Sequence, residues 1–382
     1  MRRPPPTPPA PRATRHRTRP VRLAVVLLLG LLMALTTAPA GSATTTDTTA
    51  DTATAPADVR TAALPSSFQW SSSGQLISPK PDGSHNIVAV KDPTVVQHDG
   101  RWHVYMTTAN TAGQWSLAHT SFTDWSQAAA APHTYLDTNP DIGNRYAAAP
   151  QVFYFAPRDE WYLVYQTGLP SFSVNSDPGD PAGWSAPRNF QNSMPDIIRD
   201  NIGDGHWVDF WVICDDTMCY LYSSDDNGQL YRAETTIGEF PDGFRNTRIE
   251  LQDANRYALF EGSAIYRVQD TDTYLLIIEA IGSDGRRYYR SFTSQGLDGQ
   301  WQPLAASEAN PFARANNTAF PGGAWTQDIS HGELVRSGSD QTMTIDPCRL
   351  QLLYQGQDPG AGGDYSQLPW RLGLLTQTNP TC

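Results

Sequence analysis

The sequence predicts an all-β protein, a five-bladed β-propeller whose central channel is the candidate active site. Three observations lead to this fold. Five segments repeat a strand rich in aromatic and β-branched residues, a turn, and a second such strand. Each repeat adds a further edge-like strand, and the repeats are spaced by roughly 50 to 70 residues, which is typical of propeller blades. The repeats begin near Asp92, Pro150, Asp209, Glu261 and His331.

Alternation and turn residues predict the strand pairs of each repeat in chain order. Residues 92–96 should pair with 102–105, 151–155 with 161–165, 208–213 with 219–222, 263–266 with 274–278, and 332–335 with 343–345. The third strands are expected at 115–118, 172–174, 230–232, 288–290 and 352–354. If the first strand of every blade lines the channel, residues at the same phase of distant repeats meet there.

The N-terminal part of the chain has a different composition from the repeats. Residues 1–40 are typical of a secretory signal peptide, because an arginine-rich start precedes the short apolar run 23–35 and an Ala-Pro-Ala site. Residues 41–63, rich in Thr and Ala, are expected to form a linker. Residues 64–382 are sufficient for one catalytic propeller domain. We therefore expect a secreted, extracellular protein with no membrane segment after signal cleavage.

Charge and cysteine content narrow the possible partners. The net charge is -12 and no basic stripe alternates with aromatic residues, so a neutral substrate is favoured over nucleic acid. The four cysteines suggest two disulfides in an exported protein, Cys214 with Cys219 and Cys348 with Cys382. Free buried thiols are the alternative. No Cys/His cluster indicates zinc.

Charged residues stand at the expected channel end of otherwise apolar strands. Asp92, Asp209 and Glu261 begin the first strands of repeats one, three and four, and His331 begins that of repeat five. Any one carboxylate could be a solvated strand end, but three at one phase favour a shared site. Asp92 beside Lys91 would stay ionised as a base. Glu261 among apolar neighbours would stay protonated as an acid, and Asp209 would raise the Glu261 pKa further by repulsion.

An acid and a base on either side of a sugar ring are the groups that glycoside hydrolysis needs, and a wide separation would invert the anomeric centre. The sequence has no G-x-S-x-G elbow, no glycine-rich phosphate loop and no H-E-x-x-H motif. His331 could ligate a cation such as calcium, orient a sugar hydroxyl, or cap its strand. No organic cofactor is expected.

Seven sequence blocks, in order, resemble glycoside hydrolase family 62, the α-L-arabinofuranosidases that act on arabinoxylan. The blocks are Val90–Thr94, Asn139–Gly143, Ala148–Tyr154, His206–Asp209, Phe260–Gly262, Asp328–Glu333 and Leu353–Gly356. The resemblance covers essentially all of residues 66–380. It implies a five-bladed propeller that inverts configuration and removes arabinofuranosyl side chains from arabinoxylan or from arabinose-substituted xylo-oligosaccharides.

The resemblance also implies a role for each matching residue. Asp92 would be the general base, Asp209 the pKa modulator and Glu261 the general acid. Lys91 would contact the arabinose, and Tyr365 would contact the xylan backbone. His331 would hold a calcium ion near the channel.

Two departures from the family pattern affect the outer sugar contacts. Thr167 stands where a stacking tryptophan is expected after Tyr165-Gln166, and Ser366 stands where an asparagine is common. Both departures bear on the preferred polymer rather than on arabinofuranose cleavage. The alternatives are an arabinanase or β-xylosidase of the related propeller family, a non-catalytic sugar-binding propeller, and a structural or adhesive protein. We expect a monomer.

Overall fold

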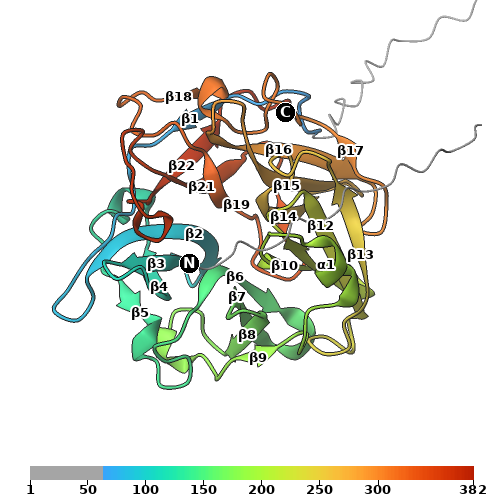
Figure 1. Cartoon of the computed structure of the whole chain (residues 1–382), viewed down its shortest axis with the longest axis horizontal. Coiled ribbons are helices and arrows are strands. Elements are labelled where there is room, and N and C mark those ends of the chain that lie inside the picture. The colour runs from blue at the N-terminus through green and yellow to red at the C-terminus, as the bar shows by residue number, and fades with distance from the viewer. Residues whose placement is uncertain (1–62) are drawn as a thin grey trace, which may run out of the picture. The chain divides into compact units, whose positions relative to one another are not determined.

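Five β-sheets surround a central channel in the computed structural model, which describes residues 63–382 (Figure 1). The first three blades are β2–β5 (Ile87–His98, Arg101–Asn110, Trp115–Phe122, Thr134–Tyr135), β6–β9 (Ala148–Phe155, Glu160–Gln166, Pro170–Asn175, Arg188–Asn189) and β10–β13 (Val208–Cys214, Met218–Ser224, Gln229–Thr236, Arg245–Gln252). The short helix α1 (Asp196–Asn201) precedes β10. The prediction of an all-β five-bladed propeller is confirmed. The predicted signal peptide and all but the last residue of the predicted linker lie outside the described residues.

The last two blades take strands from distant parts of the chain. Blade 4 contains β14–β17 (Glu261–Val268, Tyr274–Ile281, Arg287–Ser294, Gln302–Pro303) and β20 (Thr344–Ile345). Blade 5 contains β19 (Ser330–Leu334), β21 (Gln351–Gly356), β22 (Arg371–Gln377), β1 (Trp70–Ser72) and β18 (Thr318–Ala319). Strand β1 pairs antiparallel with β22, so the beginning of the described chain completes the last blade and closes the ring.

The predicted fifth hairpin is wrong. Strand β19 pairs with β21, whereas β20 pairs in parallel with β14 of blade 4. The predicted third strand at 352–354 is therefore the second strand of blade 5, and β22 is the third. The segment that follows β19 crosses below the channel, where Ser339, Gln341 and Met343 accept backbone hydrogen bonds from Tyr154, Cys214 and Arg267. These three donors belong to blades 2, 3 and 4, so the segment links the C-terminal ends of three inner strands, away from the bulges.

Aromatic and aliphatic side chains fill the blades. Trp70 of β1 is 1% exposed, donates to the Phe312 carbonyl at 2.6 Å and packs edge-on against the Phe312 ring. Both predicted disulfides are present: Cys214–Cys219 spans the first hairpin of blade 3, and Cys348–Cys382 fastens the C-terminus to blade 5. Residues 63–382 include no helix with the length and apolar character that a bilayer crossing needs.

Every inner strand changes register at the same level of the channel. The shifts follow Lys91, Ala148, Val208, Glu261 and Ser330. Such β-bulges turn side chains out of the strand's alternation. The residue after the shift has a left-handed backbone in four blades, with φ of 47° at Asp92, 51° at Ala149, 58° at Asp209 and 62° at Gly262.

The bulges show that the predicted common phase of the three carboxylates is wrong for Glu261. Asp92 and Asp209 are the bulge residues of their blades, but in blade 4 Gly262 has that position and Glu261 lies one residue earlier. Glu261 is thus in register with Lys91 rather than with Asp92. The pocket wall therefore contains bulge residues, such as Asp92 and Asp209, together with Lys91 and Glu261 from the position before the bulge.

Hydrogen bonds between blades hold each bulge. The second strand of one blade supplies a side chain that accepts from the bulge N–H of the next: Thr107 from Ala149 (2.8 Å), Gln166 from Asp209 (3.0 Å), Glu279 from His331 (2.6 Å) and Gln355 from Asp92 (2.7 Å). Between blades 3 and 4, the Asp209 carboxylate itself accepts from Gly262 N–H at 2.9 Å. The hydrogen bonds that join neighbouring blades therefore also fix the positions of the carboxylates.

Candidate active site

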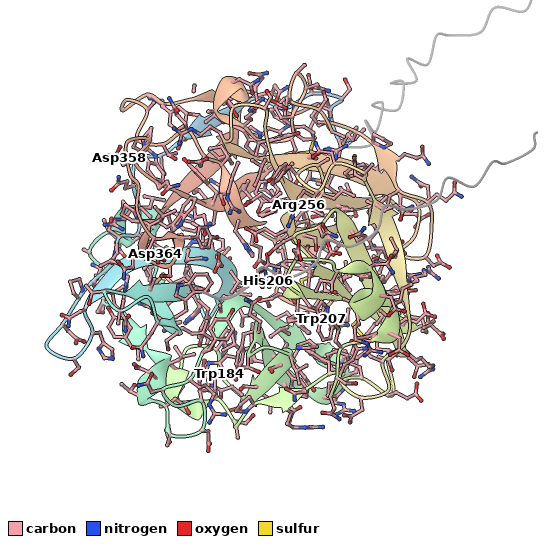
Figure 2. All side chains as sticks on the ribbon, viewed as in Figure 1. Trp184, His206, Trp207, Arg256, Asp358 and Asp364 are labelled. Carbon is pink, nitrogen blue, oxygen red and sulfur yellow. A yellow bond between two sulfur atoms is a disulfide. The ribbon has the colours of Figure 1, made fainter. Side chains whose placement is uncertain are left out.

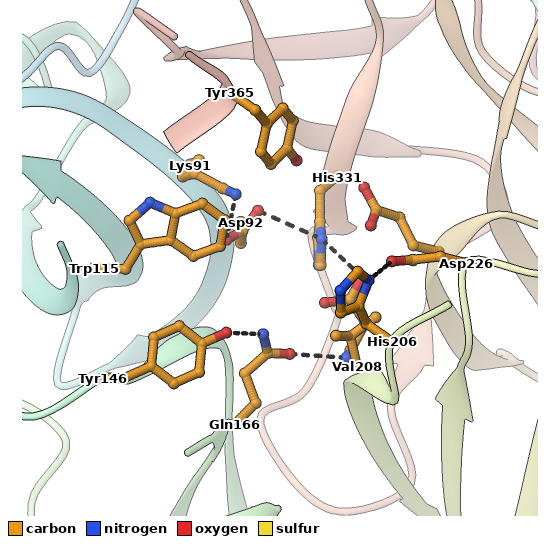
Figure 3. A pocket seen from close by; sticks show the side chains of 12 residues that line it. Lys91, Asp92, Trp115, Tyr146, Gln166, His206, Val208, Asp226, His331 and Tyr365 are labelled. Atoms are coloured by element: carbon orange, nitrogen blue, oxygen red, sulfur yellow. Dashed lines mark hydrogen bonds and ion pairs between the residues drawn. The ribbon is translucent and has the colours of Figure 1, made fainter. Parts of the chain in front are cut away.

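A pocket of about 290 Å³ opens at the end of the channel where the bulges lie (Figure 3). Its walls contain all six residues that the sequence predicts for the site: Lys91, Asp92, Asp209, Glu261, His331 and Tyr365. The other lining residues are Trp115, Tyr146, Gln166, His206, Val208 and Asp226. The structure thus brings together side chains from all five blades, and from the 3-10 helix Tyr365–Gln367 that precedes β22.

The base candidate Asp92 lies between two cationic groups. Lys91 Nζ is 3.6 Å from Asp92 Oδ2, and His331 Nδ1 is 3.5 Å from Asp92 Oδ1. Lys91 is buried, yet the negative charge of Asp92 raises its pKa despite the opposing effect of burial. Its ammonium lies 3.8 Å from the centre of the Trp115 ring, so an aromatic face and a carboxylate fix the lysine together.

Asp209 is a buried lining residue of the pocket. Burial raises its pKa to about 7, and the charges of Glu261 and Asp92 act in the same direction. The imidazole of His331, 3.6 Å away, and the Gly262 N–H partly offset this effect. A carboxyl group with this pKa changes its charge near neutral pH, and it therefore alters the field at both neighbouring carboxylates.

Glu261 pairs with Arg287, a residue that sequence reasoning missed. Arg287 Nη1 donates to Glu261 Oε1 and also to Glu279 Oε1. Burial disfavours the charge of Glu261, but Arg287 together with Lys91 holds its pKa below the usual range. The expectation that apolar neighbours raise this pKa is wrong, because the decisive neighbour, Arg287, comes from β16.

Asp226 and His206 form the part of the rim nearest to blade 3, as Figure 3 shows. His206 Nδ1 is 3.2 Å from Asp226 Oδ2. Burial raises the Asp226 pKa to about 9, and the charges of Glu261 and Asp209 add to this effect. Arg256 donates two hydrogen bonds to the Asp226 carbonyl, at 3.1 and 2.7 Å. In Figure 2, His206 is labelled near the channel, whereas Arg256 is labelled towards β12 and β14.

Sequence reasoning missed Asp226 because it considered only the first strand of each repeat. Asp226 has φ of 54° in the turn between β11 and β12. The Asp-Asp-Asn-Gly run at 225–228 was a visible turn signal. That signal does not tell which carboxylate faces the channel.

His331 lies between Asp92 and Asp209, and these carboxylates raise its pKa against the effect of burial. Among residues 63–382, no group of three or more His, Cys, Asp and Glu side chains is arranged to hold a metal ion. Calcium prefers six to eight oxygen ligands. The protein side chains alone therefore do not make a complete calcium site at His331.

Aromatic side chains form one wall of the pocket. The Trp115 ring centre is 6.2 Å from that of Tyr146 and 6.1 Å from that of Tyr365. Tyr146 and Tyr365 are both more than 40% exposed, unlike most tyrosines of the blades. Exposed aromatic faces beside buried carboxylates suit a sugar, which presents apolar C–H groups and hydroxyls. The fold and the site together define a glycoside hydrolase.

Comparisons with known proteins agree with this class. The profile of "Glycosyl hydrolase family 62" matches residues 69–376. Alpha-L-arabinofuranosidase C of Cellvibrio japonicus is 43% identical over 320 residues, which cover 83% of this chain but only 48% of that protein. The chain thus spans about half the length of this curated relative.

Solved structures show the same relationship. The catalytic domain of the Coprinopsis cinerea GH62 α-L-arabinofuranosidase is 60% identical, with a TM-score of 0.82 over 84% of this chain and 100% of that one. A Podospora anserina α-L-arabinofuranosidase in complex with cellotriose is 50% identical, with a TM-score of 0.81 over 84% and 99% of the two chains. The chain belongs to glycosyl hydrolase family 62, as the sequence blocks predicted.

Proposed function

We propose that this glycoside hydrolase is a secreted α-L-arabinofuranosidase that removes arabinofuranosyl side chains from arabinoxylan with inversion of configuration. The observation that carries the proposal is the convergence of Asp92, Asp209 and Glu261 on one small pocket beside exposed aromatic rings. The named arabinofuranosidases among its relatives support the activity. A family 62 hydrolase that is 50% identical was solved in complex with xylotriose, which supports a xylan-type substrate.

In the proposed reaction Asp92 is the general base. Its carboxylate takes a proton from a water molecule as that water attacks the anomeric carbon of the arabinofuranosyl group. Lys91 Nζ and His331 Nδ1 lie 3.6 and 3.5 Å from the two carboxylate oxygens of Asp92. Lys91 also faces the pocket and would donate to a sugar hydroxyl.

Glu261 is the general acid in this proposal and donates its proton to the oxygen that leaves with the xylose unit. Asp92 and Glu261 come from blades 1 and 4, which are separated by the inner strand of blade 5. Inversion would require the two carboxyl groups to stand far enough apart for a water molecule opposite the leaving group. Because an acid must carry a proton, substrate binding has to weaken the pairing of Glu261 with Arg287.

Asp209 modulates both groups through its charge and its hydrogen bond from Gly262 N–H. The bond fixes the residue next to Glu261, and repulsion from ionised Asp209 would favour the protonated form of Glu261. Tyr365, whose ring lies 5.3 Å from Lys91 Nζ, would contact the xylan backbone at the pocket rim.

We also propose that a calcium ion binds near His331, but we assign it no role in the reaction steps. A calcium ion there would take the imidazole as one ligand and water for most of the others, and it would supply positive charge near Asp92 and Asp209. The expected result of removing divalent ions with EDTA is a lower melting temperature that calcium restores. An unchanged melting temperature would argue against a bound ion.

A substrate screen tests the proposed activity. Release of free arabinose should be fastest from arabinoxylan, with little from linear arabinan and no xylose from unsubstituted xylo-oligosaccharides. Arabinose from linear arabinan alone would favour the arabinanase reading. Binding of these glycans without any product would favour a sugar-binding protein. Sedimentation of the purified protein would test the monomeric state, and analysis of the culture medium would test secretion.

A further inference from the structure

We propose that Glu279, a buried carboxylate outside the pocket, is a positioning residue that holds both reacting carboxylates in place. The inference rests on the proposed roles of Asp92 and Glu261. Glu279 is fully buried on β15 and lies directly opposite Glu261 in the register of blade 4. Two like charges opposite each other in an antiparallel pair destabilise a sheet. Their retention therefore needs a compensating interaction.

Glu279 takes part in a network of hydrogen bonds with two arms, one from each of its carboxylate oxygens. The first arm leads to the proposed acid, Glu261. Arg287 Nη1 donates to one oxygen of Glu279 and to one oxygen of Glu261. The guanidinium is enclosed by the Phe260 and Tyr365 rings, at 5.2 and 5.7 Å from their centres. Because Glu279 is immobilised in the sheet, it fixes the arginine, and the arginine fixes the orientation of Glu261.

The second arm reaches the proposed base through blade 5. Glu279 Oε2 accepts from Ser330 Oγ at 2.7 Å and from His331 N–H at 2.6 Å. Ser330 Oγ accepts from Gln355 Nε2 at 3.0 Å, and Gln355 Oε1 accepts from Asp92 N–H at 2.7 Å. Ser330, Gln355 and Asp92 are all buried. One continuous chain of hydrogen bonds therefore joins Glu261 to Asp92 without passing through the pocket.

Only a carboxylate can accept on both arms at once. Its Oε1 faces a guanidinium, and its Oε2 faces a hydroxyl and a backbone N–H, so every neighbour is a donor. A glutamine has the same shape but presents an NH₂ group on one side. That group would face a donor and leave one arm broken in a buried site.

The test compares Glu279→Gln with a matched control, Glu333→Gln. Glu333 is another buried glutamate, 1% exposed, and it pairs with Arg336 at 2.7 Å on the inner strand of blade 5. Both variants lose one buried ion pair, but only the first breaks the network. Kinetics are measured on an arabinose-substituted xylo-oligosaccharide and on 4-nitrophenyl arabinofuranoside, whose leaving group needs little protonation.

For Glu279→Gln we expect kcat on the oligosaccharide to fall about 10- to 100-fold, as for a small misplacement of reacting groups, with KM changed less than about twofold. The loss should be smaller on the nitrophenyl substrate. Glu333→Gln should keep the wild-type kcat even if its melting temperature falls. A wild-type kcat in Glu279→Gln, or equal losses in both variants, would overturn the inference.

Two further variants keep the result decisive. If Glu279→Gln does not fold, Ser330→Ala removes one link and should lower kcat about threefold or more, since small shifts of reacting groups slow the reaction. An unchanged kcat in that variant contradicts the network. Glu261→Gln separates the two proposals: if it is inactive while Glu279→Gln is normal, only the positioning role fails. If Glu261→Gln stays fully active, the acid assignment and the inference fall together.

Discussion

Replacing Asp209 with asparagine should stabilise the protein at alkaline pH while it removes activity. Burial raises the pKa of this carboxyl to about 7 in the folded protein, against an ordinary value of 3.8. At about 1.4 kcal/mol per pKa unit, roughly three units correspond to about 4 kcal/mol. Because His331 lies close to Asp209 and titrates together with it, part of this free energy belongs to the pair. We therefore expect the variant to gain about 2 to 4 kcal/mol in free energy of unfolding.

The sign of the effect follows from proton uptake. The folded state binds the Asp209 proton more tightly than the unfolded state does, so this contribution to stability is fully present below pH 4. It is lost as the pH rises through 7. Asparagine does not titrate and can still accept the hydrogen bond from Gly262 N–H. The variant should therefore be more stable than the wild type at pH 8 and not at pH 4.

Urea unfolding followed by tryptophan fluorescence at pH 4, 6 and 8 measures the difference. The gain should appear between pH 4 and pH 8 and reach its full size at pH 8. Equal stabilities at pH 8, or a gain that is largest at pH 4, would refute the assignment of a raised pKa to Asp209. If Asp209 modulates the reacting carboxylates, the same variant should also lose kcat by at least about 100-fold.

Three other predictions concern single features of the structure. Glu261→Gln should lower kcat on arabinoxylan oligosaccharides by about 10²- to 10⁴-fold with little change in KM, measured by arabinose release. Lys91→Met removes the charge 3.6 Å from Asp92 and should reduce kcat/KM at least about tenfold, the effect of one lost charged hydrogen bond; a normal kcat/KM would exclude its contact with the sugar. Trp70→Ala should cost about 3 to 5 kcal/mol in urea unfolding, since the buried indole closes the ring through β1, and a loss below 1 kcal/mol would contradict that role.

The sequence predicted the blades well where strand pairing is local. The first four hairpins join neighbouring segments through short turns, so alternation and turn residues suffice. In blade 5, a segment that crosses under the channel separates β19 from β21. The strand at 344–345 has the composition of a hairpin partner, but its backbone pairs with β14. Local propensity cannot distinguish these two partners.

Asp92, Asp209, Glu261 and His331 were predicted because the inner strands begin at a similar phase, whereas Lys91 and Tyr365 came from the family resemblance. Arg287 and Glu279 were missed because they come from the third and second strands of blade 4. Asp226 was missed because it lies in a turn. Their importance depends on side-chain contacts that the strand pattern does not show, and Arg287 reverses the expected direction of the Glu261 pKa. Flanking residues alone are thus a poor guide to the pKa of a channel carboxylate.

Proton NMR of the protein acting on arabinoxylan tests the central claim most directly. The anomeric signals of the first minutes report the configuration of the sugar before it equilibrates. We predict that β-L-arabinofuranose appears first, since a base-activated water attacks opposite the leaving group. Initial α-arabinose would imply a covalent enzyme intermediate and would contradict the roles of Asp92 and Glu261.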